Sequence, residues 1–329
     1  MKDWKIIPRE YIPRDDAVIL DIKFPYKGLE ITGDVYLPVK ARCVTVFLHG
    51  LGQNHDNTIP IRDVLPEYSA IIKTTQTGHP PVGGNIDPRL NEEITRYILD
   101  RVYDLCHSEN VFLAAHSAGC HPAMAAARRD DVLGVILISP PYDLSEPIIK
   151  RRLGVRMGIF TAKHSKKASD YLNGREWKWK SKATGAKRKI KIDDIPQSAI
   201  NIIETPKLGK YEYELPPPFL GFHGTEDKVV EFGDSVQLKE DLEEKGIPMQ
   251  LVLLNGATHY PMTERGDVLR MGYNIREWMN WVMGADEQDK NWLVRKHKKL
   301  VRDPIEERRR FSYVEQLLSE TDPDALALE

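Results

Sequence analysis

Ser117 is the residue of this chain best placed to act as a nucleophile. Residues 111–115 form an apolar run typical of a buried strand, and an alanine-rich segment typical of a helix opens at Gly119. A serine on such an abrupt turn holds its hydroxyl above the sheet edge. The backbone N–H of Ala118 then points at the atom that the hydroxyl attacks. The pattern predicts a nucleophile and one donor of an oxyanion hole.

The stretch Ala115-His-Ser-Ala-Gly119 is close to the motif G-x-S-x-G. Alanine replaces the first glycine and adds only a methyl group at a point where helix and strand must pack closely. Cys120 lies too far from the apex of the turn to be the nucleophile, and we expect a small buried side chain there. The departure from the motif therefore leaves the prediction for Ser117 in place.

A serine hydroxyl is a weak nucleophile at neutral pH and needs a base that is itself oriented by a carboxylate. In a doubly wound sheet these groups must follow the carboxyl ends of strands, where the crevice opens. Asp227 follows the apolar run 219–223, and His259 follows the run 250–254. We predict that Ser117 is the nucleophile, His259 the base and Asp227 the acid.

Two other carboxylates compete for the role of the acid. Asp143 lies just beyond the apolar run 133–138, and Asp234 lies near the start of the next expected helix. A carboxylate at a helix N-terminus is favourable without any catalytic role. Placement favours Asp227, and the other two positions stay open at this point.

Short apolar runs alternate with amphipathic segments, which predicts an α/β fold with a doubly wound, mostly parallel sheet and helices on both faces. The expected strands are residues 17–24, 29–37, 43–48, 70–74, 111–115, 133–138, 219–223 and 250–254. The expected helices are residues 88–107, 235–245 and 270–282. The carboxyl ends of these strands must bring the three predicted residues together.

The alternation is interrupted once, so we predict one core formed by residues 1–139 and 216–284 with an insertion at residues 140–215. Residues 163–191 carry eleven Lys or Arg against two acidic residues, with aromatic residues between them. Such a segment suits an anionic substrate or a membrane surface, whereas nucleic acid is disfavoured. The simplest alternative is a solvated run of charges.

The charged residues 285–329 are expected to form a helical C-terminal extension. Asp303-Pro304 has the pattern of an N-cap followed by proline at the first helical position. A partial apolar stripe beyond it would pack on the core or on a second subunit, so an oligomer through these helices is one expectation. The segment is the third part of the predicted domain organisation.

The overall composition predicts a soluble protein in a reducing compartment. The formal net charge is -2, which gives no global attraction to nucleic acid or membranes. The three cysteines are odd in number and show no C-x-x-C spacing. No signal peptide or apolar run long enough for a spanning helix is seen. We expect a cytoplasmic protein.

No cofactor or metal ion is expected from the sequence. The histidines are dispersed, and neither a His-x-x-x-His pair on a helix nor a cysteine pair occurs. The pair Gly83-Gly84 lacks the lysine and the spacing of a phosphate-binding loop. Backbone N–H groups are sufficient for the oxyanion chemistry predicted above.

The chain resembles the α/β-hydrolase fold family from about residue 17 to residue 283, apart from the insertion. Its order Ser, Asp, His is the order of that family. It is most similar to the capped branch of lysophospholipases, monoglyceride lipases and serine aminopeptidases. The turn Gly78-His79 and the acid segment Gly224-x-x-Asp-x-x-Val230 match family patterns. The resemblance implies that Leu51, after the pair His49-Gly50, is the second oxyanion donor and that the insertion is a lid.

The remaining histidines have simpler explanations. His49 and His223 each precede a glycine at a strand end, and we expect both to make buried hydrogen bonds. His116 next to the serine is expected to be structural. His55 and His79 lie on loops near the expected cleft and are the two candidates for a substrate contact.

The sequence thus predicts a serine hydrolase that cleaves a carboxylic ester, as a carboxylesterase or an acylglycerol or lysophospholipid lipase. A small-molecule acyl ester is the expected substrate. The same machinery would serve an acyl-thioesterase or a serine aminopeptidase. A hypothesis of another class is a binding module that keeps the fold without catalysis.

Overall fold

The computed structural model describes residues 3–12, 17–56, 58–84, 87–106, 108–143, 207–212, 217–263 and 265–284. It also describes the backbone of two short paired strands, β8 (Trp177–Lys180) and β9 (Lys187–Ile190). All of these belong to one compact unit that ends at Gly284. The predicted extension at residues 285–329 and most of the predicted insertion lie outside the described residues, so both stay predictions.

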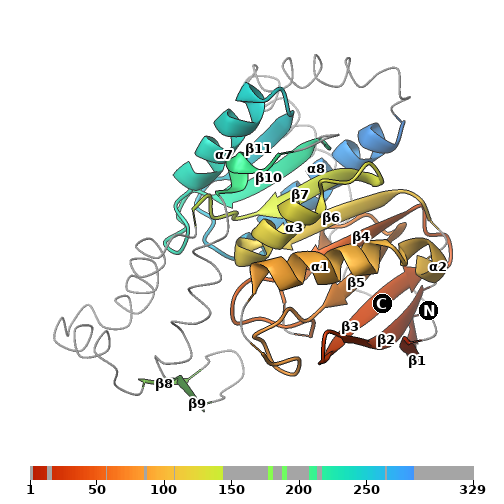
Figure 1. The fold of residues 1–329 in the computed structure, drawn as a ribbon. Coiled ribbons are helices and arrows are strands. Elements are labelled where there is room, and N and C mark those ends of the chain that lie inside the picture. The colour runs from red at the N-terminus through yellow and green to blue at the C-terminus, as the bar shows by residue number, and fades with distance from the viewer. Residues whose placement is uncertain are drawn as a thin grey trace, which may run out of the picture. The chain divides into compact units, whose positions relative to one another are not determined.

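A nine-stranded sheet organises this unit, with the order β1-β2-β3-β5-β4-β6-β7-β10-β11 (Figure 1). The bounds are β1 Lys5–Ile12, β2 Ala17–Tyr26, β3 Leu29–Pro38, β4 Cys43–Leu48, β5 Ser69–Thr74, β6 Val111–His116, β7 Val132–Ile138, β10 Phe219–Gly224 and β11 Met249–Leu254. In this sheet β1–β2, β2–β3 and β3–β5 are antiparallel pairs. The remaining neighbours, in the order β5-β4-β6-β7-β10-β11, are parallel pairs. The predicted mostly parallel, doubly wound sheet is confirmed.

Every strand expected from the sequence is present within two residues of its predicted ends, but β1 was not predicted. This edge strand has mainly exposed residues, so it carries no alternating apolar signal. Its pairing with β2 also shifts register between Pro8 and Glu10. An exposed edge strand with a proline gives little that a sequence pattern can detect.

Five α-helices accompany the described sheet: α1 (Pro88–Leu99), α2 (Val102–Cys106), α3 (Cys120–Ala126), α7 (Gly233–Glu244) and α8 (Arg265–Gly284). The prediction of a single helix over residues 88–107 is wrong, because α1 ends at Leu99 and a second helix, α2, begins at Val102. The Arg101 N–H donates to the Ile98 carbonyl at 2.9 Å, a tight turn that interrupts the helix while the apolar stripe continues across it. No helix in the described ranges is both long and apolar enough to cross a membrane.

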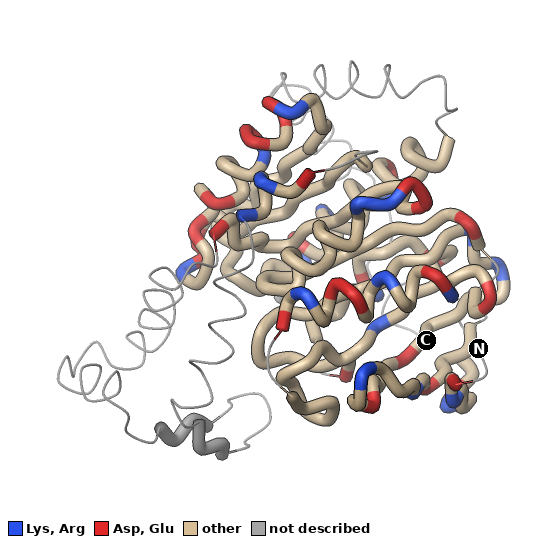
Figure 2. The backbone as a smooth tube through the Cα atoms, in the orientation of Figure 1, with Lys and Arg blue, Asp and Glu red and all other residues tan. Residues whose placement is uncertain are grey.

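Two apolar layers flank the sheet (Figure 1). Helices α1, α2, α3 and α7 contribute to one layer, which includes Ile98, Met124 and Leu238. Helix α8 contributes to the other, which includes Met271 and Trp278. Basic and acidic residues occur together along α1, whereas α7 carries mainly acidic residues (Figure 2). Central strands such as β4, β6 and β10 are buried on both faces, as their continuous apolar sequences require.

The chain leaves and rejoins the sheet at neighbouring points around the predicted insertion. Strands β7 and β10 pair directly, although residues 139–218 separate them along the chain. The Leu208 N–H donates to the Tyr142 carbonyl at 3.1 Å, and the Tyr142 hydroxyl donates to the Asp241 carboxylate on α7. The two ends of the intervening segment are thus joined to each other and anchored on the core.

Packing of α8 on β7 depends on a glycine. A Cβ atom on Gly134 would lie 2.4 Å from the Trp278 ring, which is well inside the contact distance. Trp278 is 3% exposed, so its ring has little room to move.

We expect Gly134→Ala to lower the free energy of unfolding by about 1–3 kcal/mol, because the added methyl group overpacks this contact. Trp278→Leu removes the ring and should make Gly134→Ala much less costly in the double variant. Urea unfolding of the two single variants and the double variant measures the coupling. Additive losses would show that the ring and the glycine do not interact.

Candidate active site

The turn after β6 holds Ser117 in a strained backbone conformation. Its φ angle is +53°, in the left-handed region that non-glycine residues rarely adopt. A short 3-10 turn (Ser117–Gly119) then leads into α3. This is the predicted strand-turn-helix geometry, and it directs the serine side chain away from the strand that precedes it.

The turn is possible because Gly119 approaches the neighbouring strand closely. A Cβ atom there would lie 2.5 Å from the Leu48 carbonyl oxygen and 2.6 Å from that of His49. Ala115, at the first position of the motif, is fully buried and pairs with both β4 and β7. The second glycine is the one that the local geometry requires.

The three residues predicted to act together lie in one hydrogen-bonded chain. Nε2 of His259 is 3.0 Å from Oγ of Ser117, and its Nδ1 is 2.7 Å from Oδ2 of Asp227. They follow the carboxyl ends of β6, β11 and β10, and each is less than 10% exposed. Distances of this kind suit proton transfer between the serine and the imidazole.

The loops that carry Asp227 and His259 are joined to each other directly. A Cβ atom on Gly224, the last residue of β10, would lie 2.2 Å from the Ala257 carbonyl oxygen. The Glu226 N–H donates to that same carbonyl at 2.9 Å. The spacing between the Asp227 carboxylate and the His259 imidazole thus comes from backbone contacts as well as from the two side chains.

The Asp227 carboxylate is surrounded by four donors. Oδ1 accepts the N–H groups of Val229 and Val230 at 2.8 and 2.9 Å. Oδ2 faces Nδ1 of His259 and Nε2 of His223, the latter at 3.2 Å. Burial by itself raises the pKa of Asp227, but the hydrogen bonds from the two histidines outweigh it and hold the pKa well below its usual range.

The two competing carboxylates are engaged elsewhere. Oδ2 of Asp143 lies 3.3 Å from the Lys207 ammonium, and Oδ2 of Asp234 accepts the Tyr142 N–H at 2.8 Å. Asp227 is the carboxylate of the three that contacts His259.

The backbone of His259 is held by two side chains whose contacts the sequence did not predict. Its carbonyl oxygen lies 3.0 Å from Nε2 of His116 and 3.4 Å from the Ser139 hydroxyl. The ring of His116 also lies 4.9 Å from the His259 ring. These contacts join residues far apart in the chain, and no local motif encodes them. A structural role was expected for His116, but not this contact with the His259 backbone.

The loop after β4 approaches the serine, as its predicted oxyanion role requires. A Cβ atom on Gly50 would lie 3.0 Å from Cβ of Ser117. The Gly50 N–H donates to Oε1 of Gln53 at 2.9 Å, which closes a turn containing Leu51. Leu51 thus directly follows Gly50, which approaches Ser117, and Ala118 directly follows Ser117 itself. Gln53 is a further part of this turn that the sequence did not single out.

The two histidines proposed for substrate contact are both buried. His55 Nδ1 lies 2.6 Å from Thr75 Oγ1. His79 Nδ1 lies 3.1 Å from the Thr77 carbonyl, and its ring meets the His49 ring edge-on. Burial lowers the pKa of His55 and of His79, so both favour the neutral form. Their role toward a substrate stays a prediction.

His49, as expected, makes buried hydrogen bonds. Its Nδ1 donates to the Gly50 carbonyl and its Nε2 accepts the Gln76 N–H at 2.9 Å. Burial lowers the pKa of His49 to about 3, so this ring is a neutral support of the loop.

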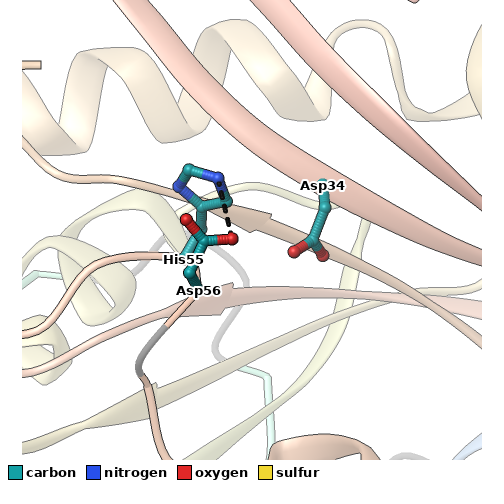
Figure 3. Close-up of side chains that lie close together, drawn as sticks. All are labelled: Asp34, His55 and Asp56. Carbon is teal, nitrogen blue, oxygen red and sulfur yellow. Dashed lines mark ion pairs between the residues drawn. The ribbon is translucent and has the colours of Figure 1, made fainter. Parts of the chain in front are cut away.

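One group of side chains has the spacing of a cation site (Figure 3). Ligand atoms of Asp34, His55 and Asp56 lie within 4.8 Å of one another. The Lys73 ammonium, however, lies 3.0 Å from Oδ2 of Asp34 and donates to the His55 carbonyl. A protein cation thus already neutralises the buried carboxylate. Sequence spacing could not reveal the cluster, because its members come from separate segments.

The three cysteines are free, buried thiols. Burial raises the pKa of Cys43 to about 11 and that of Cys106 to about 12, and it raises the pKa of Cys120 further. A buried thiol with a raised pKa is a poor nucleophile. Cys120 is the small buried side chain that was expected beside the turn.

Comparisons with known proteins give one matching family model and several similar folds. The model of the "Alpha/beta hydrolase family" matches residues 45–270. No curated protein sequence gives a significant match. Est1E from Butyrivibrio proteoclasticus has a similar fold, with a TM-score of 0.58 and 18% identity over 80% of this chain and 99% of that chain.

Two archaeal structures are similar as well. The Pyrococcus furiosus esterase Pf2001 has a TM-score of 0.61 and 14% identity over 85% of this chain and 99% of that chain. A monoacylglycerol lipase from Paleococcus ferrophilus has a TM-score of 0.53 and 17% identity, over 77% of this chain and 99% of that chain. Identities this low show a shared fold, and the branch suggested by the sequence stays a prediction. Because the family match spans more than half of the 329 residues, the chain belongs to the alpha/beta hydrolase family.

Proposed function

We propose that the protein is a serine hydrolase that cleaves a carboxylic ester through an acyl-enzyme intermediate. The observation that carries this proposal is the continuous chain of hydrogen bonds from Ser117 through His259 to Asp227, at the carboxyl ends of three parallel strands. Family membership gives independent support for hydrolysis.

In the first half of the reaction, His259 Nε2 takes the proton of the Ser117 hydroxyl as its oxygen attacks the ester carbonyl. A tetrahedral oxyanion forms, and collapse of this intermediate breaks the bond to the leaving alcohol. The alcohol leaves with the proton that His259 carries. The acyl group is then bonded to Ser117 through a new ester.

The second half repeats the chemistry with water. His259 removes a proton from the water, whose oxygen attacks the acyl-enzyme carbonyl. Collapse of the second oxyanion releases the carboxylic acid, and Ser117 regains its proton from His259. No oxidant, reductant or further group enters the balance.

Two sets of groups stabilise the charges that develop. The ionised Asp227 orients the imidazole and stabilises its cation, a role supported by the depressed pKa of the carboxyl. The N–H groups of Leu51 and Ala118 are the proposed donors to the oxyanion. Losing one such donor typically raises the barrier by about 3–4 kcal/mol.

An ester is the favoured substrate class, because the Pyrococcus furiosus structure is described as an esterase and the Paleococcus ferrophilus structure as a monoacylglycerol lipase. Acylglycerols and lysophospholipids are the natural esters proposed from the resemblance. Thioesters and peptide bonds remain alternatives that use the same groups. A non-catalytic binding module is the alternative of another class, and the first prediction below separates it from an enzyme.

A fluorophosphonate probe is expected to label the wild-type protein covalently at Ser117. Ser117→Ala should abolish labelling and lower kcat by roughly a factor of 10⁶. Cys120→Ala is the matched control, since it removes the nearest thiol and should leave labelling intact. Near-normal turnover of folded Ser117→Ala would rule out this serine as the nucleophile, and a folded wild type that does not label would favour the binding module.

Substrate class is tested with p-nitrophenyl esters of graded chain length beside a thioester and an aminoacyl amide. We expect turnover of the esters, with Ser117→Ala as the blank. Preference for long chains would support a lipase, and preference for short chains a carboxylesterase. Turnover of the amide alone would replace the ester proposal with a peptidase.

The depressed pKa of Asp227 makes its contribution to stability depend on pH. The carboxyl has a pKa of about 4 in the unfolded chain, and the native pKa is lower. The contribution is therefore complete above pH ~4 and is lost as the pH falls toward the native pKa.

We expect the destabilisation caused by Asp227→Asn to be largest near neutral pH and to shrink as the pH falls from ~5 to ~2.5. Urea unfolding at several pH values measures it. Asp104→Asn, at an exposed position of α2, is the control and should show little change over this range. A cost of Asp227→Asn that does not vary with pH would contradict the assigned ionisation.

A further inference from the structure

We propose that His223, whose Nε2–H tautomer is set by the acceptors at Nε2 and supported by a hydrogen bond from Ser235, is a positioning residue that holds the Asp227 carboxylate toward His259. This inference rests on the proposed function, because the carboxylate has a catalytic meaning only if His259 acts as the base. The contacts extend the hydrogen-bonded chain by two residues beyond the predicted acid.

His223 lies near the end of β10, and its side chain is fully buried. Its Nδ1 is 2.6 Å from the Ser235 hydroxyl on α7. Its Nε2 is 3.0 Å from the Val230 carbonyl oxygen and 3.2 Å from Oδ2 of Asp227. Both ring nitrogens therefore have partners inside the protein.

These partners determine the tautomer. A carbonyl oxygen and an ionised carboxylate only accept hydrogen bonds, so Nε2 of His223 must carry the proton that is shared between Val230 and Asp227. In the neutral ring Nδ1 is then an acceptor, and the Ser235 hydroxyl donates to it. Ser235 thus donates to His223, His223 donates to Asp227, and His259 donates to the same carboxylate oxygen.

These contacts fix the orientation of the Asp227 carboxylate, and its negative charge is shared among several donors. Oδ2 faces two imidazole N–H groups, while Oδ1 faces two backbone N–H groups. Loss of the His223 donor would leave more of the charge on Oδ2 for His259. The His259 cation would then be more stable, and the imidazole would become neutral only at a higher pH.

Other titratable groups face this chain and stay unchanged in the test. The rings of His116 and Tyr260 lie 4.9 and 5.3 Å from the His259 ring. On α7, Asp234 precedes Ser235, and its carboxylate accepts the Tyr142 N–H. A change seen only on altering His223 or Ser235 is therefore attributable to the proposed contacts.

The test measures the rate of fluorophosphonate labelling against pH for the wild type and for His223→Leu, His223→Gln and Ser235→Ala. We expect His223→Leu to move the acid limb of the profile upward by about 0.5–1 pH unit. His223→Gln restores an N–H donor near the place of Nε2 and should keep the wild-type limb. Ser235→Ala removes the hydrogen bond to Nδ1 that supports the His223 ring and should shift the limb in the same direction by a smaller amount.

Two NMR measurements give readouts independent of labelling. The ¹⁵N shifts of His223 should show a protonated Nε2 and an unprotonated Nδ1, and the titration of the His259 ring should move with the acid limb. Protonation of Nδ1 instead, or a folded His223→Leu or Ser235→Ala with a wild-type His259 titration, would overturn the inference. Failure of the wild type to label, with His259 titration shifted as expected in the variants, would instead refute the proposed function.

Discussion

The geometry of the site depends on keeping one carboxylate ionised inside the protein. Burying a charge costs several kcal/mol unless donors replace the lost water. The donors to Asp227 come from the loop that follows β10, from β10 itself and from the loop that follows β11. These segments meet because β10 and β11 pair in parallel to their last residues, where Gly224 faces Leu254. The register of two buried strands thus determines whether the charge is compensated.

The nucleophile depends on a second constraint, which is steric rather than electrostatic. The left-handed conformation of Ser117 is unfavourable by itself and persists only where surrounding contacts determine it. Those contacts are the close approach of Gly119 to β4 and of Gly50 to Ser117. Because the same loop after β4 carries Leu51, the strain at the serine and the place of a proposed oxyanion donor have one origin. These contacts lie within the protein itself, and electrostatic catalysis depends on groups that are fixed in advance.

Much of this arrangement was predictable because it is encoded locally. Buried parallel strands read as continuous apolar runs, and the turn residues that follow them marked Ser117, Asp227 and His259 as neighbours at one edge. The edge strand β1 has no such run, since it is mainly exposed. The break between α1 and α2 was missed because the apolar stripe does not stop there.

Contacts between distant segments that no strand-end motif marks were not predictable. The contact of His116 with the His259 carbonyl joins residues whose numbers differ by 143, and the Asp34 cluster joins β3 to a loop. The contacts of His223 could be expected in kind, as buried hydrogen bonds, but not in partner. His223 lies four residues before Asp227, and this spacing brings the two side chains together only because the chain turns back after β10 ends.

The hydrogen bond between Leu208 and Tyr142 has a consequence for how such a protein can evolve. Tyr142 and Leu208 lie next to each other, so any segment that joins them leaves and rejoins the core at one place. The entropy of closing a loop grows only with the logarithm of its length, about 0.6 kcal/mol for each doubling. Segments of very different size and composition could therefore be exchanged at this point with little effect on the stability of the core. The chemistry of the strand ends and the selection of what reaches them can in this way evolve as separate traits.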